Sequence, residues 1–455
     1  MDPNVDPRVD LLVVGGGIHG AAVARDAARR GLSVVLAERG DLAQGTSSRS
    51  SKLIHGGIRY LESGQLGLVR EALHERAILL RTAPHLVRPL PFVLPYQRGA
   101  GRPAWLVRAG LALYDRLAGA GRDEPGVLPR HRHLDADEAR ALEPGLPAAG
   151  LTGAALFHDA QMDDARLVVA NAVDAAAAGA RVLVRAPVTA FAPAGAGGGW
   201  RATFESGESL AARLVINATG PWADTVRALA GRGGPPAIRP TRGSHVVVPA
   251  LTRGHALLLF AADGRVFFVL PYGTRSLVGT TDVDFPGDPA TVAPAAADVR
   301  LLRDEIELRW PGRGGPIGRA FAGLRPLLAH GGATPALPWR NTREARILEE
   351  AGMLSLVGGK YTTARALAER AVDRAVTLLG AGGRVRACDT ATAVLPARPG
   401  EMVMPAAATR DPEPALRPDD VRFAVEHEFA RGAGDVIWRR SALWLDRAAA
   451  RAAAP

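Results

Sequence analysis

Three side chains suited to chemistry, His55, Arg59 and Tyr60, follow a glycine-rich turn within the first sixty residues of this chain. The imidazole of His55 titrates near neutral pH, which makes it a candidate general base. The run from Asp10 to Tyr60 joins the turn to these side chains without an intervening domain. A ligand-binding turn and a reactive loop are therefore expected side by side.

The turn has the pattern G-x-G-x-x-G, formed by Gly15, Gly17 and Gly20 directly after the apolar run 11–14. Such a run is typical of a parallel strand buried on both faces. The first glycine of the pattern permits a tight turn, the second lets the backbone approach a pyrophosphate, and the third lets the next helix pack closely. The N-terminus of that helix attracts phosphate groups. The pattern predicts a dinucleotide site.

The next segments indicate which dinucleotide is bound. A strand predicted over 33–37 ends at Glu38, where a carboxylate suits ribose hydroxyls and repels a 2′-phosphate. The chain then enters a hydroxyl-rich run instead of a further βαβ unit, which favours FAD over NAD. The candidate FAD contacts in this run are Thr46, Ser47, Ser51 and Lys52.

Distant segments also predict backbone close to the cofactor. A second strand, glycine turn and helix start follow one another at 353–363, where Gly359 and Thr362 can offer polar groups to a flavin ring. The apolar run 214–217 leads to the small residues Ala218 and Gly220. The further expected cofactor contacts are Gly56 and Val188.

Lysine usage adds an independent indication. Lys52 and Lys360 are the only lysines among 56 basic residues, and all the others are arginines. An ammonium is a compact charge whose pKa shifts readily, and a broad guanidinium cannot replace it in a tight pocket. Both lysines lie in predicted cofactor loops, so we interpret them as functional, with chance as the alternative.

These motifs resemble the FAD-dependent glycerol-3-phosphate dehydrogenases, quinone-linked enzymes within the glycine and D-amino-acid oxidase group. The most specific segments are SSKLIHGGIRYLE, VINATGPWAD, LVGTTDVDFPGD and GGKYTTAR. The resemblance implies a Rossmann-like, doubly wound α/β FAD-binding domain with an inserted antiparallel-sheet substrate domain and a short helical C-terminal segment. The expected boundaries are 8–88, 150–235 and 323–385 for the FAD-binding domain, 89–149 and 236–322 for the cap, and 400–455 for the C-terminal segment.

The resemblance also implies a reaction: oxidation of sn-glycerol 3-phosphate to dihydroxyacetone phosphate by FAD, with a quinone as electron acceptor. His55, Arg325 and Lys360 are then expected to be catalytic, with His55 as base and the charge of Lys360 close to the reacting atoms. The expected substrate-binding residues are Arg59, Tyr60, Thr280 and Arg343. The alternatives are structural: His55 bonded to backbone, Arg325 paired with a carboxylate, and Arg343 on a solvated charged face. No metal is expected.

Other functions stay open. An oxidase would pass the same electrons to O₂, and an amine or amino-acid oxidase of this fold would bind a substrate carboxylate with its arginines. The net charge of +10 favours an anionic partner. Nucleic acid is the least favoured of these partners, because no repeat of aromatic and basic residues accompanies the charge.

Composition bears on location. The single cysteine, Cys388, rules out a disulfide framework and suits a reducing cytoplasm. No apolar run reaches the ~18 residues of a spanning helix. The resemblance implies peripheral contact with the cytoplasmic face of the inner membrane and allows a homodimer, although the part after Pro418 is shorter than relatives usually carry. Residues 105–117 carry apolar side chains at helical spacing, which suits either a lipid surface or packing on the cofactor domain.

Overall fold

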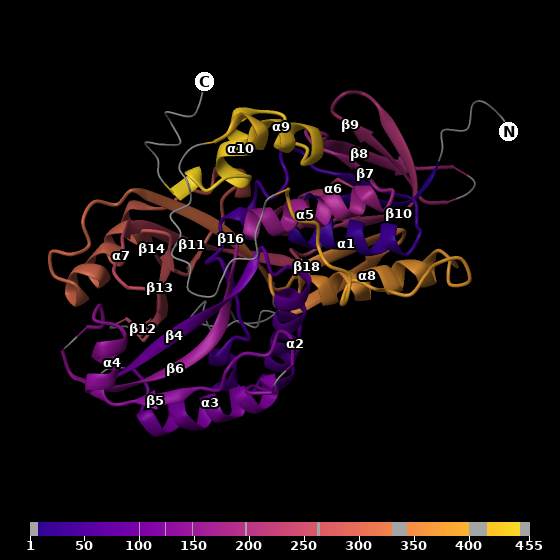
Figure 1. The fold of residues 1–455 in the computed structure, drawn as a ribbon. Coiled ribbons are helices and arrows are strands. Elements are labelled where there is room, and N and C mark those ends of the chain that lie inside the picture. Colours follow the sequence, from indigo (N-terminus) through magenta and orange to yellow (C-terminus); the bar gives the residue numbers. More distant parts are fainter. Residues whose placement is uncertain are drawn as a thin grey trace.

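Two β-sheets form the framework of the protein (Figure 1). The computed structural model describes residues 8–99, 101–122, 124–147, 149–195, 198–261, 264–329, 344–399 and 416–445. Arg343, one of the expected substrate-binding residues, lies outside this part of the chain.

The first sheet has the strand order β17-β18-β10-β1-β2-β7. Its central pairs, β10 with β1 and β1 with β2, are parallel, as the buried apolar run 11–14 predicts. The hairpin of β8 and β9 extends the sheet from β10. The strands are β1 (Val9–Val14), β2 (Val34–Ala37), β7 (Arg181–Leu183), β8 (Val188–Pro193), β9 (Trp200–Phe204), β10 (Ser209–Asn217), β17 (Ala345–Glu350) and β18 (Met353–Gly358).

Helices cover one face of this sheet, as Figure 1 shows. They are α1 (Ile18–Arg29), α5 (Asp164–Ala177) and α8 (Ala364–Leu378). Alanines such as Ala21, Ala24 and Ala27 of α1 are fully buried, and their short side chains let the helix lie close to the strands. On the other face the β8–β9 hairpin and α6 (Ala223–Leu229) bury Leu12 and Val215. The predicted Rossmann-like fold is confirmed.

The second sheet has the order β15-β11-β14-β13-β12-β4-β6-β3, with β16 paired to β11 and β5 to β6. It is antiparallel as predicted, except that β4 and β12 are parallel. These two strands come from separate insertions, so no tight turn between them dictates their direction. The strands are β3 (Leu53–Ile54), β4 (Val87–Gln97), β5 (Arg132–Leu134), β6 (Leu151–Met162), β11 (Ile238–Pro249), β12 (Ala256–Phe260), β13 (Val266–Tyr272), β14 (Arg275–Gly279), β15 (Val283–Asp284) and β16 (Arg319–Leu328).

Three expected domain boundaries, at 88–89, 149–150 and 322–323, do not coincide with the change from one sheet to the other; β4 (Val87–Gln97) of the second sheet crosses the first of them. β6 begins at Leu151, just inside the segment assigned to the FAD-binding domain, yet it belongs to the second sheet. β16 crosses the boundary at 322–323. These strands owe their place to partners far away in the chain, as in the long register of β6 with β4. The division into domains stays a prediction.

The remaining helices pack around the second sheet and at the C-terminal end. α4 and α7 cover one face of this sheet, and α3 contributes Leu111 to the other. The C-terminal segment lies beside the first sheet in Figure 1 and is tied to it by Arg440, whose fully buried guanidinium is 2.6 Å from Asp41. The helices are α2 (Leu66–Thr82), α3 (Ala104–Ala118), α4 (Ala136–Leu142), α7 (Ala296–Arg309), α9 (Pro418–His427) and α10 (Ala433–Arg439).

Candidate active site

A cavity of about 1370 Å³ is lined by residues of both sheets. It begins at the carboxyl ends of β1 and β2 and reaches the second sheet at β11 and β16. Predicted cofactor, substrate and catalytic residues from six separate stretches of sequence meet on its wall. They are Gly15, Gly17, Glu38, Thr46, Ser47, Ser51, His55, Arg59, Tyr60, Val188, Ala218, Gly220, Thr280, Arg325, Gly359, Lys360 and Thr362.

The glycine turn forms one end of the cavity with no room for side chains. Gly15 has φ +109°, and a Cβ there would lie 2.8 Å from the carbonyl oxygen of Ala218. A Cβ on Gly20 would lie 1.8 Å from the carbonyl oxygen of Gly15. The turn thus brings bare backbone and the start of α1 to the cavity, an arrangement that fits a pyrophosphate.

Glu38 stands beside this turn at the end of β2. Its carboxylate accepts the N–H groups of Gly16 at 2.6 Å and of Gly40 at 2.8 Å. Burial raises the pKa of Glu38, and these two hydrogen bonds oppose the rise. The carboxylate is held against the cavity wall, where it suits a ribose hydroxyl.

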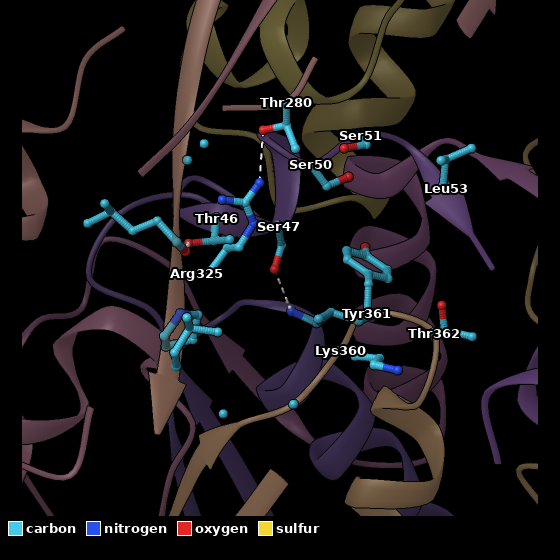
Figure 2. Close-up of a pocket in the computed structure, with 18 of the residues that line it drawn as sticks. Thr46, Ser47, Ser50, Ser51, Leu53, Thr280, Arg325, Lys360, Tyr361 and Thr362 are labelled. Carbon is cyan, nitrogen blue, oxygen red and sulfur yellow. Dashed lines mark hydrogen bonds between the residues drawn. The ribbon is translucent and has the colours of Figure 1, made fainter. Parts of the chain in front are cut away.

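The hydroxyl-rich run connects the two sheets at the cavity. Ser47 Oγ accepts the N–H of Ile18 at 3.0 Å, in the first turn of α1. Thr46 Oγ1 donates to the carbonyl of Leu324 in β16 at 2.7 Å. Figure 2 shows Thr46 close to Arg325 and Ser47 pointing toward the start of α1. The run thereby places its hydroxyls where a cofactor spanning both sheets would pass.

Three residues of the predicted cofactor site, Gly20, Lys52 and Gly56, do not line the cavity. The Lys52 side chain is 3% exposed, pairs with Asp164 and donates to the carbonyl of Ser48 at 2.9 Å. It supports the hydroxyl-rich run from behind, because the buried carboxylate of Asp164 draws the ammonium away from the cavity. Gly20 and Gly56 also lie off the lining and act through close packing.

The loop after β3 brings His55, Arg59 and Tyr60 to the cavity wall. Its backbone is tied to the second glycine turn, since the N–H of His55 donates to Thr362 Oγ1 at 3.3 Å. The Nζ of Lys360, a largely buried side chain, lies 3.8 Å from the centre of the Tyr60 ring. A cation over an aromatic face in a dry site is well stabilised.

Arg325 is held in a fixed orientation on β16. Its guanidinium donates to Thr280 Oγ1 at 2.8 Å (Figure 2). It also donates to Asp282 Oδ1 at 3.1 Å. A Cβ on Gly243 would lie 2.4 Å from this guanidinium, so the glycine leaves space for it. The pairing of Arg325 with a carboxylate, expected from the sequence as the structural alternative, is present. It orients the guanidinium on the cavity wall.

Three cavity residues were missed as site residues by sequence reasoning: His19, Arg49 and His245. Burial lowers the pKa of His19 to about 4. Burial and the nearby charge of Arg439 lower the pKa of Arg49. His19 and Arg49 sit inside motifs that were recognised, within the glycine pattern and the hydroxyl-rich run, so their positions were the available signal.

His245 joins the hydroxyl-rich run to the second sheet. Its Nε2 lies 2.9 Å from Ser51 Oγ, and its ring stacks on Phe321 at 5.1 Å. Its Nδ1 is buried without a hydrogen-bond partner among the described residues. Burial, with the charges of Arg325 and Lys52, lowers the pKa of His245 to about 3. The imidazole is therefore neutral in the folded protein at physiological pH.

This depressed pKa predicts a pH-dependent stability. Between pH 6.5 and 3 the unfolded chain binds a proton at His245 that the folded protein does not, so stability falls as pH falls. The expected loss between pH 6.5 and 5 is about 2 kcal/mol in the free energy of unfolding. Urea denaturation of wild type and His245→Gln at several pH values measures it. The variant should show a shallower fall, and equal slopes would contradict the neutral, buried state of His245.

Known proteins resemble this chain in both sequence and structure. A family model described as FAD-dependent oxidoreductase matches residues 10–374. A Brucella abortus D-erythritol 1-phosphate dehydrogenase is 43% identical over 80% of this chain and 73% of its own length. A Pseudomonas aeruginosa glycerol-3-phosphate dehydrogenase is 38% identical over 96% of this chain and 92% of its own. The solved structure of a Bacillus halodurans glycerol-3-phosphate dehydrogenase with FAD has a TM-score of 0.72 and 25% identity, covering 95% of this chain and 86% of that one.

Proposed function

This chain belongs to the family of FAD-dependent oxidoreductases, and from that premise we propose that it oxidises sn-glycerol 3-phosphate to dihydroxyacetone phosphate. FAD is its cofactor. The observation that carries the proposal is the meeting of Arg325, Lys360, Arg59 and His55 on one cavity with the glycine turn of the FAD site. Likeness to the relative named glycerol-3-phosphate dehydrogenase over nearly the whole chain supports it.

The residues of the cavity fit FAD. The bare backbone at Gly15 and Gly17 and the hydroxyl of Ser47 would hold its pyrophosphate, and the carboxylate of Glu38 would hold its ribose. When bound, FAD supplies a hydride acceptor for the carbon that bears the substrate hydroxyl. The protein must then bind the phosphate, orient the alcohol and remove its proton.

We assign these tasks to other residues of the cavity wall. Arg325 and Arg59 bind the phosphate, since guanidinium groups form paired hydrogen bonds with it, and Thr280 adds a hydroxyl. His55 takes the proton of the substrate hydroxyl as general base. Lys360 stabilises the negative charge that develops as this proton leaves, and its low exposure strengthens the effect. Tyr60 holds the ammonium of Lys360 in place.

We propose D-erythritol 1-phosphate as a second candidate substrate. D-Erythritol 1-phosphate, which the name of the 43% identical relative specifies, is likewise a polyol with a terminal phosphate. Arginines that grip a phosphate accept either molecule, so we propose phosphorylated polyols as the substrate class, with sn-glycerol 3-phosphate first.

Anaerobic addition of sn-glycerol 3-phosphate to the purified yellow protein tests the proposal. The expected result is bleaching of the flavin absorbance by this compound and not by glycerol, glycine or D-alanine. D-Erythritol 1-phosphate in the same assay ranks the two phosphorylated substrates. An unchanged spectrum with both phosphates, or bleaching by an amino acid, would overturn the assignment.

The electron acceptor is a separate part of the proposal, and we take it to be a quinone at a membrane surface. Among the described residues, no helix combines the length and the apolar character that crossing a bilayer requires. Trp105 on α3 is 70% exposed. Leu106 and Leu113 of the same helix are also exposed, and they lie at the edge of the cavity. We propose that this helix rests on lipid, which co-sedimentation with anionic vesicles measures.

Reoxidation by a soluble quinone analogue, compared with peroxide release in air, separates a dehydrogenase from an oxidase. Gel filtration tests for a homodimer.

A further inference from the structure

We propose that Tyr114 and Asp159 are positioning residues for the loop that carries His55, and that they set the rate of substrate oxidation through this loop. The inference rests on the proposed function, in which His55 removes the proton of the substrate. Tyr114 lies on α3 and Asp159 on β6, whereas the loop follows β3. The three elements meet at the cavity wall, where Asp159 is a lining residue and Tyr114 is not.

The contacts form one compact network around the backbone of Gly56. Its N–H donates to Tyr114 Oη at 2.9 Å and, at 3.3 Å, to Asp159 Oδ1. Tyr114 Oη in turn donates to the Asp159 carboxylate, 2.8 Å from Oδ1 and 2.9 Å from Oδ2. Arg76 of α2 pairs with the same carboxylate at 2.5 Å. The phenol of Tyr114 thus connects the buried ion pair of Arg76 and Asp159 to the backbone N–H of Gly56.

The network is buried, so its geometry is strongly determined. The side chains of Arg76 and Asp159 are 3% and 5% exposed, and Tyr114 is 2% exposed. Burial raises the pKa of Asp159, and the charge of Arg76 opposes this rise. A buried carboxylate that loses a hydrogen-bond donor is costly, because no water replaces the donor. A Cβ on Gly56 would lie 2.5 Å from Tyr114 Oη, so only a glycine lets the backbone approach the phenol this closely.

The same stretch of backbone is held from the opposite side by the second glycine turn. His55 N donates to Thr362 Oγ1 at 3.3 Å, one residue before the N–H that Tyr114 accepts. Thr362 Oγ1 also donates to the carbonyl of His55 at 3.4 Å, so the peptide between His55 and Gly56 is held between Thr362 and Tyr114. Thr362 lies in the same turn as Lys360, two residues earlier in the chain, whereas Tyr114 lies on α3. The clamp sets the position of the imidazole relative to the ammonium.

Removing the hydroxyl of Tyr114 releases one side of this clamp while the ring stays. Tyr114→Phe keeps the edge contact with Phe157, whose ring centre lies 6.5 Å away. The N–H of Gly56 is then left with Asp159 alone, at 3.3 Å. Misplacing a reacting group by a fraction of an ångström slows chemistry more than it weakens binding, because binding depends on other residues. The expected signature is a loss in kcat with little change in KM.

A matched control is available on β4. Tyr96 is 7% exposed, and its Oη lies 2.8 Å from His133 Nδ1, so Tyr96→Phe also deletes a buried phenol hydroxyl of the second sheet. The side chains that this hydroxyl contacts, His133 and Arg108, lie outside the loop that carries His55. A loss of stability should therefore appear in both variants, and a loss of positioning in Tyr114→Phe alone.

The experiment uses the holoenzyme of wild type, Tyr114→Phe and Tyr96→Phe, each with its FAD content measured. Hydrogen exchange followed by mass spectrometry on the peptide spanning 53–61 should show about tenfold faster exchange in Tyr114→Phe only, as expected for one lost hydrogen bond. Anaerobic stopped-flow reduction by sn-glycerol 3-phosphate should be slowed about tenfold in the same variant, with substrate affinity within about twofold of wild type.

The outcomes separate this inference from the proposed function. If sn-glycerol 3-phosphate fails to reduce the wild-type flavin, the proposed function fails, and the hydrogen-exchange arm still decides whether Tyr114 orders the loop. If the wild type is reduced and Tyr114→Phe matches Tyr96→Phe in exchange and reduction rate, the inference is wrong. Asp159→Asn serves as a second variant should Tyr114→Phe not fold. It weakens the same network, and a reduction rate equal to wild type would count against the proposal.

Discussion

Arg325→Ala is expected to lower kcat/KM for sn-glycerol 3-phosphate by about a hundredfold while FAD stays bound. The guanidinium is already oriented by Thr280, Thr281 and Asp282, so it loses little side-chain freedom when a phosphate binds. Removing it deletes charge-assisted hydrogen bonds of the kind that anchor a phosphate. It also leaves Asp282, which is 10% exposed, to repel the anionic substrate.

Arg242→Ala is the control for this effect. Arg242 lies on the neighbouring strand β11, its side chain has the same 17% exposure as that of Arg325, and it also pairs with an aspartate, Asp298. It does not line the cavity. Steady-state kinetics on both variants, with FAD absorbance as a check on folding, should show the loss in Arg325→Ala alone. A wild-type kcat/KM for that variant would place the phosphate elsewhere.

Lys360→Met should slow anaerobic flavin reduction by about a hundredfold to a thousandfold, the usual result of removing one electrostatic contact made at the reacting atoms. Methionine fills similar volume without the charge. The ammonium is largely buried and in contact with the ring of Tyr60, so water does not screen it effectively. The flavin midpoint potential should also become more negative, because a positive charge nearby favours the reduced, anionic form.

Lys360→Arg separates charge from shape in this experiment. The broader guanidinium keeps the charge but does not fit a site built for an ammonium, so we expect the potential to recover more than the reduction rate. Stopped-flow reduction and a dye-coupled titration measure the two quantities. If Lys360→Met is reduced as fast as wild type, Lys360 has no part in the chemistry.

Much of the cofactor end could be predicted because its signals are local. The glycine pattern, the strand before it and Glu38 specify a turn, a helix start and a carboxylate within thirty residues. Each depends on backbone conformation or on one short loop, and the structure places Gly15, Gly17 and Glu38 on one cavity wall. Gly358 and Gly359, at the end of β18, are predicted on the same grounds, and both line the cavity.

The substrate end depended more on resemblance than on local signals. Arg325 and Thr280 are 45 residues apart, and nothing in their own segments indicates that they share a hydrogen bond. The register of β11 with β16 on one side and β14 on the other brings them together. Lys52 shows the opposite case, since its loop predicted a cofactor contact, whereas Asp164, more than a hundred residues away, turns its ammonium from the cavity.

By itself the sequence determined the glycine cradle, the acid at the end of β2, and the presence of His, Arg and Lys side chains in reactive loops, because strand periodicity, glycine geometry and residue chemistry act over short stretches. The tertiary structure alone decided which of these groups face the cavity and which support it from behind. Pairing across the sheets and the cost of burying an uncompensated charge join residues that sequence separation keeps apart, as Tyr114, Asp159 and Gly56 show.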